Sequence, residues 1–421
     1  MTTSTYTITS RLFYAGLWCC ALPLYLLYLL YRSLAQPTYR KNILERLARY
    51  KKTLHAPLWL HAASLGEIKA AAPLLAALRL AHPELAILIS CQTPAGRNAG
   101  QALMLENSLC VYLPFDMSIF TNRFISIFKP RIALIFETEI WPNLFLSTRQ
   151  AGIPLMMINA RITERSVRRY AKFGTLVAQA LKLPDAIVCQ TQADADRYIQ
   201  AGALPSVVSV SGNIKWDSGF EPEAKHDALN QKHPVWLAAS THEDEEQIVL
   251  QMHRKLLQQW PEALLLWAPR HPERFMSTYS QAMEAGFRIQ RRSQQDLPDS
   301  NGQVFLIDTL GELLQFMPGA NVVFVGGSLQ NIGGHNVLEP ASLGLPVLVG
   351  PHTQNFAEIV AHLKQAGGLI QVQDAAQLYE SLIDLLGNPE RANTMGNSGL
   401  ECVAQNRGAL QKTKALIDQR L

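Results

Sequence analysis

The chain has 421 residues, of which 48% are hydrophobic and 17% charged, and its formal net charge is +4. This length accommodates two domains with separate cores. The charge is too small to indicate nucleic acid as a partner, and none is predicted. The six cysteines form no CxxC pair, so we expect reduced thiols and no structural zinc.

The first predicted element is a membrane-spanning helix. No charged residue lies between Arg11 and Arg32, and Leu12 to Tyr31 matches the roughly 20 apolar residues that span a bilayer. A cleaved signal peptide is the alternative, although no clear small-x-small cleavage site follows the run. Basic residues are concentrated between Arg32 and Lys52, whereas Arg11 stands alone before the helix. The positive-inside rule therefore predicts a cytoplasmic location for the rest of the chain, held against anionic lipids.

The rest of the chain is predicted to be α/β, because short apolar runs alternate with helical patterns such as Ile68–His82 and Ser166–Leu181. The first series of predicted strands is Leu58–His61, Ala86–Ser90, Val111–Leu113, Ile132–Phe136, Leu155–Ile158, Ile187–Cys189 and Val207–Val210. The second series is Trp236–Ala239, Leu264–Ala268, Phe287–Gln290, Phe305–Ile307, Val322–Val325, Val347–Val349 and Leu369–Val372. Between them, Gly212–Pro234 is rich in glycine, proline and charge and is interpreted as a domain boundary.

This pattern predicts three parts. They are an anchor over residues 1–34, a first Rossmann-like domain over 35–215 and a second over 216–421. Ligands bind at the carboxyl edge of such sheets, so we expect the two domains to face each other across a cleft.

The first candidate motif is HAASLGE, from His61 to Glu67, which follows a strand and leads into a helix. Gly66 permits a tight turn, and Glu67 falls in the first helical turn at the carboxyl edge of the sheet. The helix dipole alone would explain a carboxylate here, and it would lower the pKa of Glu67. A general base needs a pKa closer to the working pH, so desolvation would have to offset the dipole.

The second motif is FETEIWPN, in which two carboxylates directly follow an apolar strand. With a period of two, Glu137 and Glu139 share a face, which predicts mutual repulsion or a cationic partner. Lys215 follows another strand and is the candidate cation, with an exposed loop lysine as the alternative.

The third motif places Arg161, Arg165 and Arg168 or Arg169 at helical i, i+4 and i+7 or i+8 spacing. Such a face is commonly only solvated. Beside a membrane it also suits a phosphorylated lipid headgroup, so these arginines are candidate residues for binding such a headgroup.

The second domain contains a glycine-rich segment, Asn321–Pro351, with glycine pairs at 326–327 and 333–334. Glycines let backbone N–H groups approach a phosphate, and the helix that follows adds its positive dipole. Asn336 and Glu339 are placed to reach a sugar hydroxyl. A turn that needs glycine only for its geometry is the alternative.

Three further segments of this domain are predicted to end near the same edge of the sheet. Ser240-Thr241-His242 and Pro269-Arg270-His271 both follow strands. Thr309 to Glu312 has the T-x-x-E pattern of a helix capping box, whose free N–H groups would meet a base or phosphate.

Together these motifs resemble those of the Kdo transferases of lipopolysaccharide synthesis. The motifs are HAASLGE, FETEIWPN, NARIT, GNIKWD, APRHPERF and GGHNVLEP, in this order. That family transfers 3-deoxy-D-manno-octulosonic acid (Kdo) from CMP-Kdo to a lipid A precursor, lipid IVA, and has the GT-B fold of two Rossmann-like domains. The resemblance implies a bacterial inner-membrane glycosyltransferase that uses neither a metal nor another cofactor. One departure is Ala48, where the family usually has glycine, and we expect a slightly altered turn there.

The resemblance also implies roles for the matching residues. Glu67 is the catalytic base, and Glu137 and Lys215 stabilise the transition state. The segments that hold CMP contain Pro269, Arg270, Leu310, Gly311, Glu312, Asn336, Val337, Leu338 and Glu339. The base removes the acceptor proton as the oxygen attacks opposite the departing CMP, which inverts the configuration, while Arg270 stabilises the phosphate.

Three alternatives remain open on the sequence alone. An NAD-dependent oxidoreductase would explain two Rossmann-like halves, but GGSLQNIGG is not the GxGxxG fingerprint with an acidic residue ~20 positions later. A non-enzymatic, membrane-tethered nucleotide-binding protein would leave Glu67 and Glu137 dispensable. A membrane-associated glycosyltransferase that uses a UDP-sugar is the third alternative.

Overall fold

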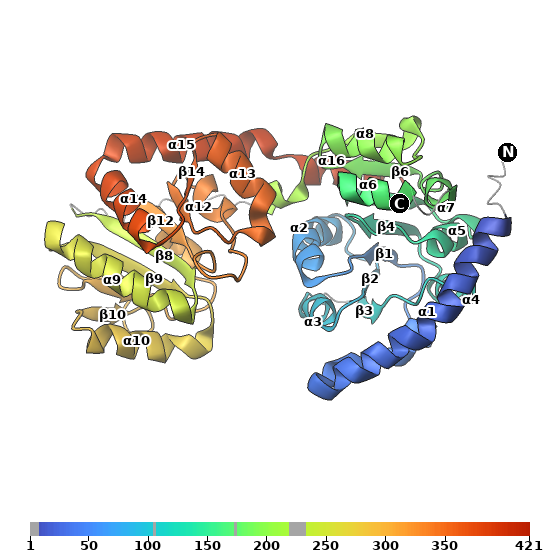
Figure 1. Ribbon diagram of the computed structural model, residues 1–421, viewed down its shortest axis with the longest axis horizontal. Coiled ribbons are helices and arrows are strands. Elements are labelled where there is room, and N and C mark those ends of the chain that lie inside the picture. The colour runs from blue at the N-terminus through green and yellow to red at the C-terminus, as the bar shows by residue number, and fades with distance from the viewer. Residues whose placement is uncertain (1–7, 104–106, 172–174, 219–232) are drawn as a thin grey trace. The chain divides into compact units, whose positions relative to one another are not determined.

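The computed structural model describes residues 8–103, 107–171, 175–218 and 233–421 (Figure 1). The chain forms two compact units, Met1–Asp217 with Arg407–Leu421, and Ser218–Asn406. The expected second domain, 216–421, therefore differs from the structure at both ends, because Trp216, Asp217 and the last fifteen residues belong to the first unit.

The return of the chain to the first unit is explained by α16 (Ala409–Asp418). The Asp217 carboxylate accepts hydrogen bonds from the backbone N–H groups of Gly408 at 2.7 Å and Leu410 at 2.8 Å. A carboxylate at this position satisfies N–H groups that have no partner inside the helix. Leu410 and Ile417 are buried in a core of the first unit.

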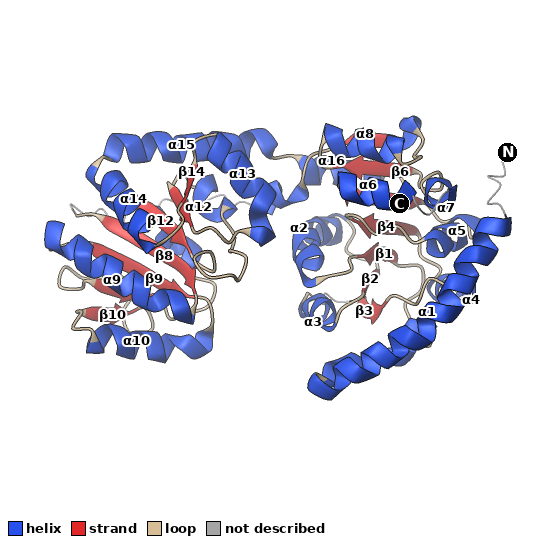
Figure 2. Cartoon of the chain, in the orientation of Figure 1, coloured by secondary structure: helices blue, strands red, loops and turns tan. Residues whose placement is uncertain are grey.

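The first unit contains a parallel sheet of seven strands in the order β3-β2-β1-β4-β5-β6-β7. The strands are β1 (Leu58–His61), β2 (Ile87–Cys91), β3 (Ser108–Tyr112), β4 (Ile132–Phe136), β5 (Leu155–Ala160), β6 (Ala186–Cys189) and β7 (Val208–Val210). Helices lie on both faces of the sheet (Figure 2). They include α2 (Leu65–Ala81), α3 (Pro94–Ala102), α4 (Ser118–Phe128), α5 (Pro142–Gln150), α6 (Glu164–Ala171), α7 (Thr175–Ala180) and α8 (Gln192–Gln200).

These elements confirm the seven strands predicted for the first domain. The single helix predicted over Ser166–Leu181 appears as α6 and α7, and residues 172–174 between them lie outside the described residues.

Strand β4 shows why the strands could be predicted from the sequence. Ile132, Leu134 and Phe136 pack in one core with residues of α2 and α16, whereas Ala133 and Ile135 pack in the other with residues of α4 and α5. Successive side chains of a strand point to opposite faces. A parallel strand covered on both faces is therefore apolar at every position.

The second unit contains another seven-stranded parallel sheet, in the order β10-β11-β9-β8-β12-β13-β14. The strands are β8 (Val235–Thr241), β9 (Leu264–Pro269), β10 (Ile289–Arg291), β11 (Val304–Leu306), β12 (Val322–Val325), β13 (Val347–Val349) and β14 (Leu369–Gln371), which confirms the second predicted series. Its helices are α9 (Glu243–Gln259), α10 (Phe275–Glu284), α11 (Leu313–Phe316), α12 (Leu338–Ser342), α13 (Ala357–Gln365), α14 (Ala375–Gly387) and α15 (Pro389–Asn406). In both sheets the strand order reverses beside the first strand, β1 or β8, which is where such folds bind ligands.

Among the described residues, α1 (Ile8–Ala35) is the one helix long and apolar enough to cross a membrane. It lies against the first unit, where the Tyr14 hydroxyl donates to Asp116 at 2.9 Å and the Trp18 and Tyr25 rings pack on Phe115. Most other apolar side chains of α1 are exposed. The predicted long apolar helix is confirmed, and its location in a membrane stays a prediction.

Ala48, the departure from the family pattern, is fully buried and has a φ of 55°. This left-handed conformation costs a residue with a Cβ roughly 1–2 kcal/mol and costs glycine nothing. The turn thus has the conformation that suits glycine, and the alanine adds strain to it.

We expect a chain that lacks residues 1–33 to fold, because no described residue of α1 belongs to either core of the first unit. Loss of the Tyr14–Asp116 hydrogen bond and of the contacts on Phe115 should lower the melting temperature by a few degrees. Activity on an acceptor in vesicles should fall more than activity on the same acceptor in detergent. Tyr14→Phe in the full chain is the control for the hydrogen bond alone. A truncated chain that does not fold, or that is fully active on vesicles, would contradict the role of α1 as an anchor.

Candidate functional site

Glu67 lies in the first turn of α2 and takes part in a reciprocal cap of that helix. Its Oε2 accepts the backbone N–H of Ala63 at 2.7 Å, and its Oε1 accepts the Ser64 hydroxyl at 3.0 Å. Ser64 in turn accepts the backbone N–H of Glu67. These contacts explain why the sequence begins a helix here and fix the direction of the carboxylate.

The electrostatic surroundings of Glu67 favour its protonated form. Burial raises its pKa, and the negative charges of Glu139 and Glu137 raise it further. The hydrogen bonds from Ala63 and Ser64 act in the opposite direction and do not outweigh burial. Desolvation therefore offsets the helix terminus, which is the condition that the sequence analysis set for a general base.

Glu137 directly follows β4 and has a φ of 58°, a strained conformation for a residue other than glycine. Its Oε1 lies 3.2 Å from Nζ of Lys215, and its Oε2 lies 3.9 Å from Nε of Arg161. Lys215 comes from the 3₁₀ turn Ile214–Ser218 after β7. The predicted pairing of Lys215 with a glutamate of this motif is thus confirmed for Glu137.

The period-two argument, which predicted a shared face for Glu137 and Glu139, does not apply to these two residues. The strand ends at Phe136, and the left-handed Glu137 turns the chain away from strand geometry. Glu139 accepts a hydrogen bond from Nε1 of Trp141 at 2.8 Å and lies 3.7 Å from Nε2 of the fully buried His61.

Two neighbouring carboxyl groups thus have pKa values displaced in opposite directions. Burial raises the pKa of Glu139, but its contacts with His61 and Trp141 outweigh burial and leave the pKa below its ordinary value. Glu67, by contrast, has a raised pKa. Pairs of this kind are typical of sites that perform acid–base chemistry.

The arginines of the basic motif do not all lie on one helix. Helix α6 begins at Glu164, so Arg161 precedes it and lies beside Glu137 instead of on a helical face with the other arginines. Arg165 and Arg168 are exposed on α6, and Arg168 pairs with Glu164 at 3.0 Å. The expected single face of three arginines is therefore wrong for Arg161.

In the second unit, the first glycine pair does not present free N–H groups to a ligand. The Glu245 carboxylate is fully buried and accepts the backbone N–H groups of Gly327 at 2.7 Å, Ser328 at 3.1 Å and Leu329 at 3.0 Å. It also accepts the N–H of His242, as the distal half of the capping box that begins α9. The expectation that the glycines at 326–327 cradle a phosphate is wrong, because the protein's own carboxylate occupies that position.

The second glycine turn leads to the segment Asn336–Glu339. Asn336 donates to Oε1 of Glu339 and accepts the N–H of Leu338, both at 3.0 Å. Burial raises the pKa of Glu339, while Asn336 and the nearby positive charge of Arg270 oppose the rise. The side chains of Val337 and Leu338 are buried, so these two residues offer a ligand only their backbone.

The segment Thr309–Glu312 does not form the predicted capping box. Helix α11 has Glu312 itself as its N-cap residue, and the Glu312 side chain accepts the Thr309 hydroxyl and a guanidinium hydrogen of Arg292. Gly311 has a φ of 83°, and Leu310 is 74% exposed. Both residues are accessible for contact with a flat ligand.

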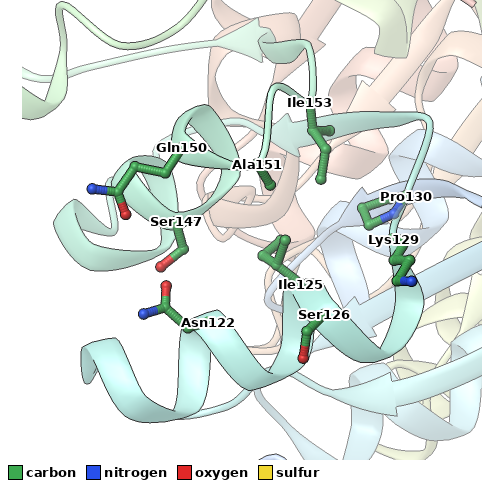
Figure 3. A pocket seen from close by; sticks show the side chains of 9 residues that line it. All are labelled: Asn122, Ile125, Ser126, Lys129, Pro130, Ser147, Gln150, Ala151 and Ile153. Carbon is green, nitrogen blue, oxygen red and sulfur yellow. The ribbon is translucent and has the colours of Figure 1, made fainter. Parts of the chain in front are cut away.

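A surface hollow of about 640 Å³ lies apart from all of these residues (Figure 3). It lies at the C-terminal ends of α4 and α5, hence at the amino edge of the sheet, opposite the edge that holds Glu67. Its lining residues are Asn122, Ile125, Ser126, Lys129, Pro130, Ser147, Gln150, Ala151 and Ile153. With no carboxylate or imidazole in its lining, this hollow is not the candidate site.

Comparison with known proteins identifies the family. Residues 41–218 match the family model described as 3-deoxy-D-manno-octulosonic-acid transferase, and residues 292–401 match that of glycosyl transferases group 1. The chain is 37% identical to the 3-deoxy-D-manno-octulosonic acid transferase of Haemophilus influenzae, covering 97% of this chain and 98% of that protein. It is 35% identical to the enzyme of the same name from Bordetella pertussis, and the match covers 89% of this chain and 90% of that protein.

The structural likeness to MurG of Acinetobacter baumannii has a TM-score of 0.54 at 12% identity and covers 87% of this chain and 99% of that one. This likeness concerns the fold alone and, with the two parallel sheets, confirms the predicted GT-B fold. The oxidoreductase and non-enzymatic alternatives are set aside by the sequence relationships. The chain belongs to the 3-deoxy-D-manno-octulosonic acid transferase family of glycosyltransferases.

Proposed function

We propose that this enzyme transfers Kdo from CMP-Kdo to the lipid A precursor lipid IVA, with inversion of configuration and without a metal ion. The observation that carries the proposal is the raised pKa of Glu67, a half-buried carboxyl group beside the Glu137–Lys215 ion pair in a chain of this family. Such a carboxyl group is suited to accept the proton of an acceptor hydroxyl near neutral pH.

In this mechanism Glu67 removes the hydroxyl proton while the acceptor oxygen forms a bond to the anomeric carbon of Kdo. The bond between that carbon and the phosphate oxygen breaks, and CMP departs with the electron pair from the opposite face. Glu137 stabilises the positive charge that develops on the sugar, and Lys215 holds Glu137 in position and balances its charge. The strained backbone at Glu137 supports such a fixed orientation.

The CMP moiety is proposed to bind in the second unit at the carboxyl edge of its sheet. Arg270 stabilises the phosphate, Asn336 and Glu339 contact the ribose, and the backbone around Gly311 contacts the base. The remaining residues of this proposed subsite are Pro269, Leu310, Glu312, Val337 and Leu338. The mutual orientation of Asn336 and Glu339 by a hydrogen bond supports a site that is ordered before the ligand binds.

Incubation of the full-length protein with CMP-Kdo and a tetra-acylated lipid A precursor, followed by mass spectrometry, tests this function. We expect a lipid product heavier by Kdo, release of CMP, and unchanged activity in EDTA. Nuclear magnetic resonance of the product should show the anomeric configuration opposite to that of the donor. Transfer from UDP-N-acetylglucosamine but not from CMP-Kdo would favour the UDP-sugar alternative.

We further propose that α1 anchors the enzyme in the bacterial inner membrane with both units on the cytoplasmic side, next to anionic lipids. The exposed apolar side chains of α1 and the basic residues that follow it support this location. Protease added to intact spheroplasts should leave both units uncut, and cleavage in Ser218–Asn406 would reverse the proposed topology.

Arg161, Arg165 and Arg168 are proposed to bind the phosphates of the acceptor. The double variant Arg165→Ala, Arg168→Ala is expected to raise the KM for lipid acceptor more than it lowers kcat, because contacts with phosphate contribute mainly ground-state binding. Arg288→Ala is the control: this exposed arginine belongs to the other unit, and its Nε donates to the backbone carbonyl of Asn301 at 2.6 Å. An unchanged KM in the double variant would mean that these two arginines are only solvated.

A further inference from the structure

Three histidines meet at the carboxyl edge of the second sheet. His242 follows β8, His271 follows β9, and His335 lies in the loop after β12, and these three strands are neighbours in the order β9-β8-β12. Nε2 of His242 lies 2.9 Å from Nε2 of His335, the ring centroids are 5.1 Å apart and the ring planes differ by 4°, so the two rings meet edge to edge in nearly the same plane. The His271 ring meets the His242 ring edge-on, also at 5.1 Å. These contacts bring three imidazoles together at the point where the strand order reverses.

The backbone beneath the imidazoles is shaped to hold them. A Cβ on Gly327 would lie 2.9 Å from the Cδ2 and Nε2 atoms of His335, and Gly327 also has a φ of 65°. Its N–H is held by Glu245, and its carbonyl accepts the N–H of Gly334 at 2.7 Å. Glycine at this position thus lets the His335 ring lie directly against the main chain. The buried carboxylate has a structural purpose here, because it fixes the loop on which the imidazole rests.

The protonation state of the group follows from its geometry. Two imidazole nitrogens 2.9 Å apart leave room for one hydrogen between them, so the pair does not carry two protons at this contact. Burial lowers the pKa of His242, and His271 and Arg270 lower it further, while Glu245 and Glu246 on α9 act in the opposite direction. Without a ligand, His242 is therefore neutral at pH 7.

The His242–His335 pair is partly exposed, holds one proton at its contact and lies near the charge of Arg270, so it has room to take up a further proton when an anion binds. An oxyanion placed against it would raise the pKa of the pair, because a nearby negative charge favours the charged imidazolium. The single imidazolium that forms in the pair would then add a charge-assisted hydrogen bond to the anion. A core histidine would behave differently: His253 is fully buried with both nitrogens bonded inside the protein, whereas His242, His335 and His271 are half-buried or exposed.

We propose that His242 and His335, with His271 at their edge, form a subsite that binds an oxyanion of the CMP-sugar donor and takes up one proton from solvent as it does so. This inference rests on the proposed function, and it assigns to these histidines contacts with the phosphate or with the sugar carboxylate. Donor affinity then falls as pH rises above the pKa of the ligand-free pair.

Calorimetric titrations of the full-length protein at pH 5.5 to 8 test the proposal. The probes are CMP, cytidine, and the 5′-methyl ester of CMP, whose phosphodiester keeps one negative charge over this range. In the wild type we expect the methyl ester to bind more weakly as pH rises and cytidine to show no such trend. Titrations in buffers of different ionisation enthalpy should show uptake of about one proton with the ester.

His335→Gln and His242→Gln should weaken binding of the ester by about 10-fold or more and abolish its pH dependence, while cytidine affinity stays unchanged. His271→Gln is the third variant, because its exposed ring can be replaced with little effect on folding. His362→Gln, on the exposed face of α13, is the matched control and should bind every probe like the wild type. Thermal unfolding of each variant establishes that it is folded.

The outcomes show whether the histidines contact the phosphate or the sugar carboxylate. They also show whether a failure concerns the histidine subsite alone or the proposed function as well. Weaker binding of the ester by the His335→Gln and His242→Gln variants assigns the subsite to the phosphate. A raised KM for CMP-Kdo with unchanged affinity for the ester assigns it to the sugar carboxylate. Folded variants that match the wild type in both measurements overturn the subsite and leave the proposed function intact. A wild type that binds no CMP and does not use CMP-Kdo overturns both.

Discussion

Glu67→Gln is expected to lower kcat by about 10²-fold or more, while CMP binds with near wild-type affinity. Glutamine keeps the shape of the side chain and one oxygen for the Ala63 N–H, but it accepts no proton. The proposed nucleotide residues belong to the other unit, so the substitution should not change CMP affinity, and the melting temperature shows whether the variant is folded. Turnover and melting temperature should be measured on the same preparation.

The pH dependence of the wild-type enzyme provides a second measurement of the same residue. Burial and the two neighbouring glutamates raise the pKa of Glu67, so the ascending limb of kcat/KM should lie above the ordinary range of a glutamate. Activity appears as the pH rises through this raised pKa, because the base acts in its ionised form. Glu84→Gln, an exposed carboxylate of the same unit, is the control and should change neither measurement. A folded Glu67→Gln enzyme with normal turnover would direct the search for the base to Glu137 or Glu139.

Glu245→Gln is expected to destabilise the second unit by about 3 kcal/mol or more. Oε2 of Glu245 accepts N–H groups from His242 and Gly327, and Oε1 accepts those of Ser328 and Leu329. An amide group in place of either oxygen leaves one buried and one partly buried N–H group without an acceptor, each at a cost of about 1–3 kcal/mol. Because the loop also supports His335, CMP affinity should fall with stability.

The matched control for this prediction lies on the same helix. Glu243 is in the first turn of α9, and its side chain is 71% exposed and pairs with Arg274 at 2.9 Å. Glu243→Gln should cost less than about 1 kcal/mol, the usual contribution of an exposed ion pair. Chemical unfolding monitored with and without CMP distinguishes the two variants. Equal stability of both variants would mean that water or a relaxed loop replaces the Glu245 carboxylate.

Much of the architecture was predictable because parallel strands buried on both faces are continuous apolar runs. Every predicted strand corresponds to an observed one, and the residues that follow β1, β4, β8 and β9 do lie at carboxyl edges. Spacing also indicated a cationic partner for a glutamate of FETEIWPN, which proved to be Lys215 for Glu137. Such predictions succeed where one dominant effect, burial or edge position, determines the outcome.

The errors arose where a distant side chain competes for a backbone group. The glycine pair at 326–327 has the pattern of a phosphate loop, but Glu245, more than 80 positions earlier, occupies its N–H groups. The H-x-x-E pattern from His242 to Glu245 does predict that Glu245 caps the start of α9. It gives no sign that the same carboxylate also accepts the N–H groups of the glycine loop. The left-handed conformation of Glu137 likewise ended the period of two on which the shared face with Glu139 depended.

The docking of α16 on the first unit has a consequence for how the protein is made. A ribosome releases the chain in order, so the segment that completes the first core, including Leu410 and Ile417, emerges after the whole of Ser218–Asn406. Until then the newly made first unit exposes the apolar surface that α16 will cover. The Asp217 carboxylate also lacks the N–H groups of Gly408 and Leu410 as hydrogen-bond donors. Loss of the last fifteen residues would therefore damage the unit that is synthesised first and leave the unit next to the break intact.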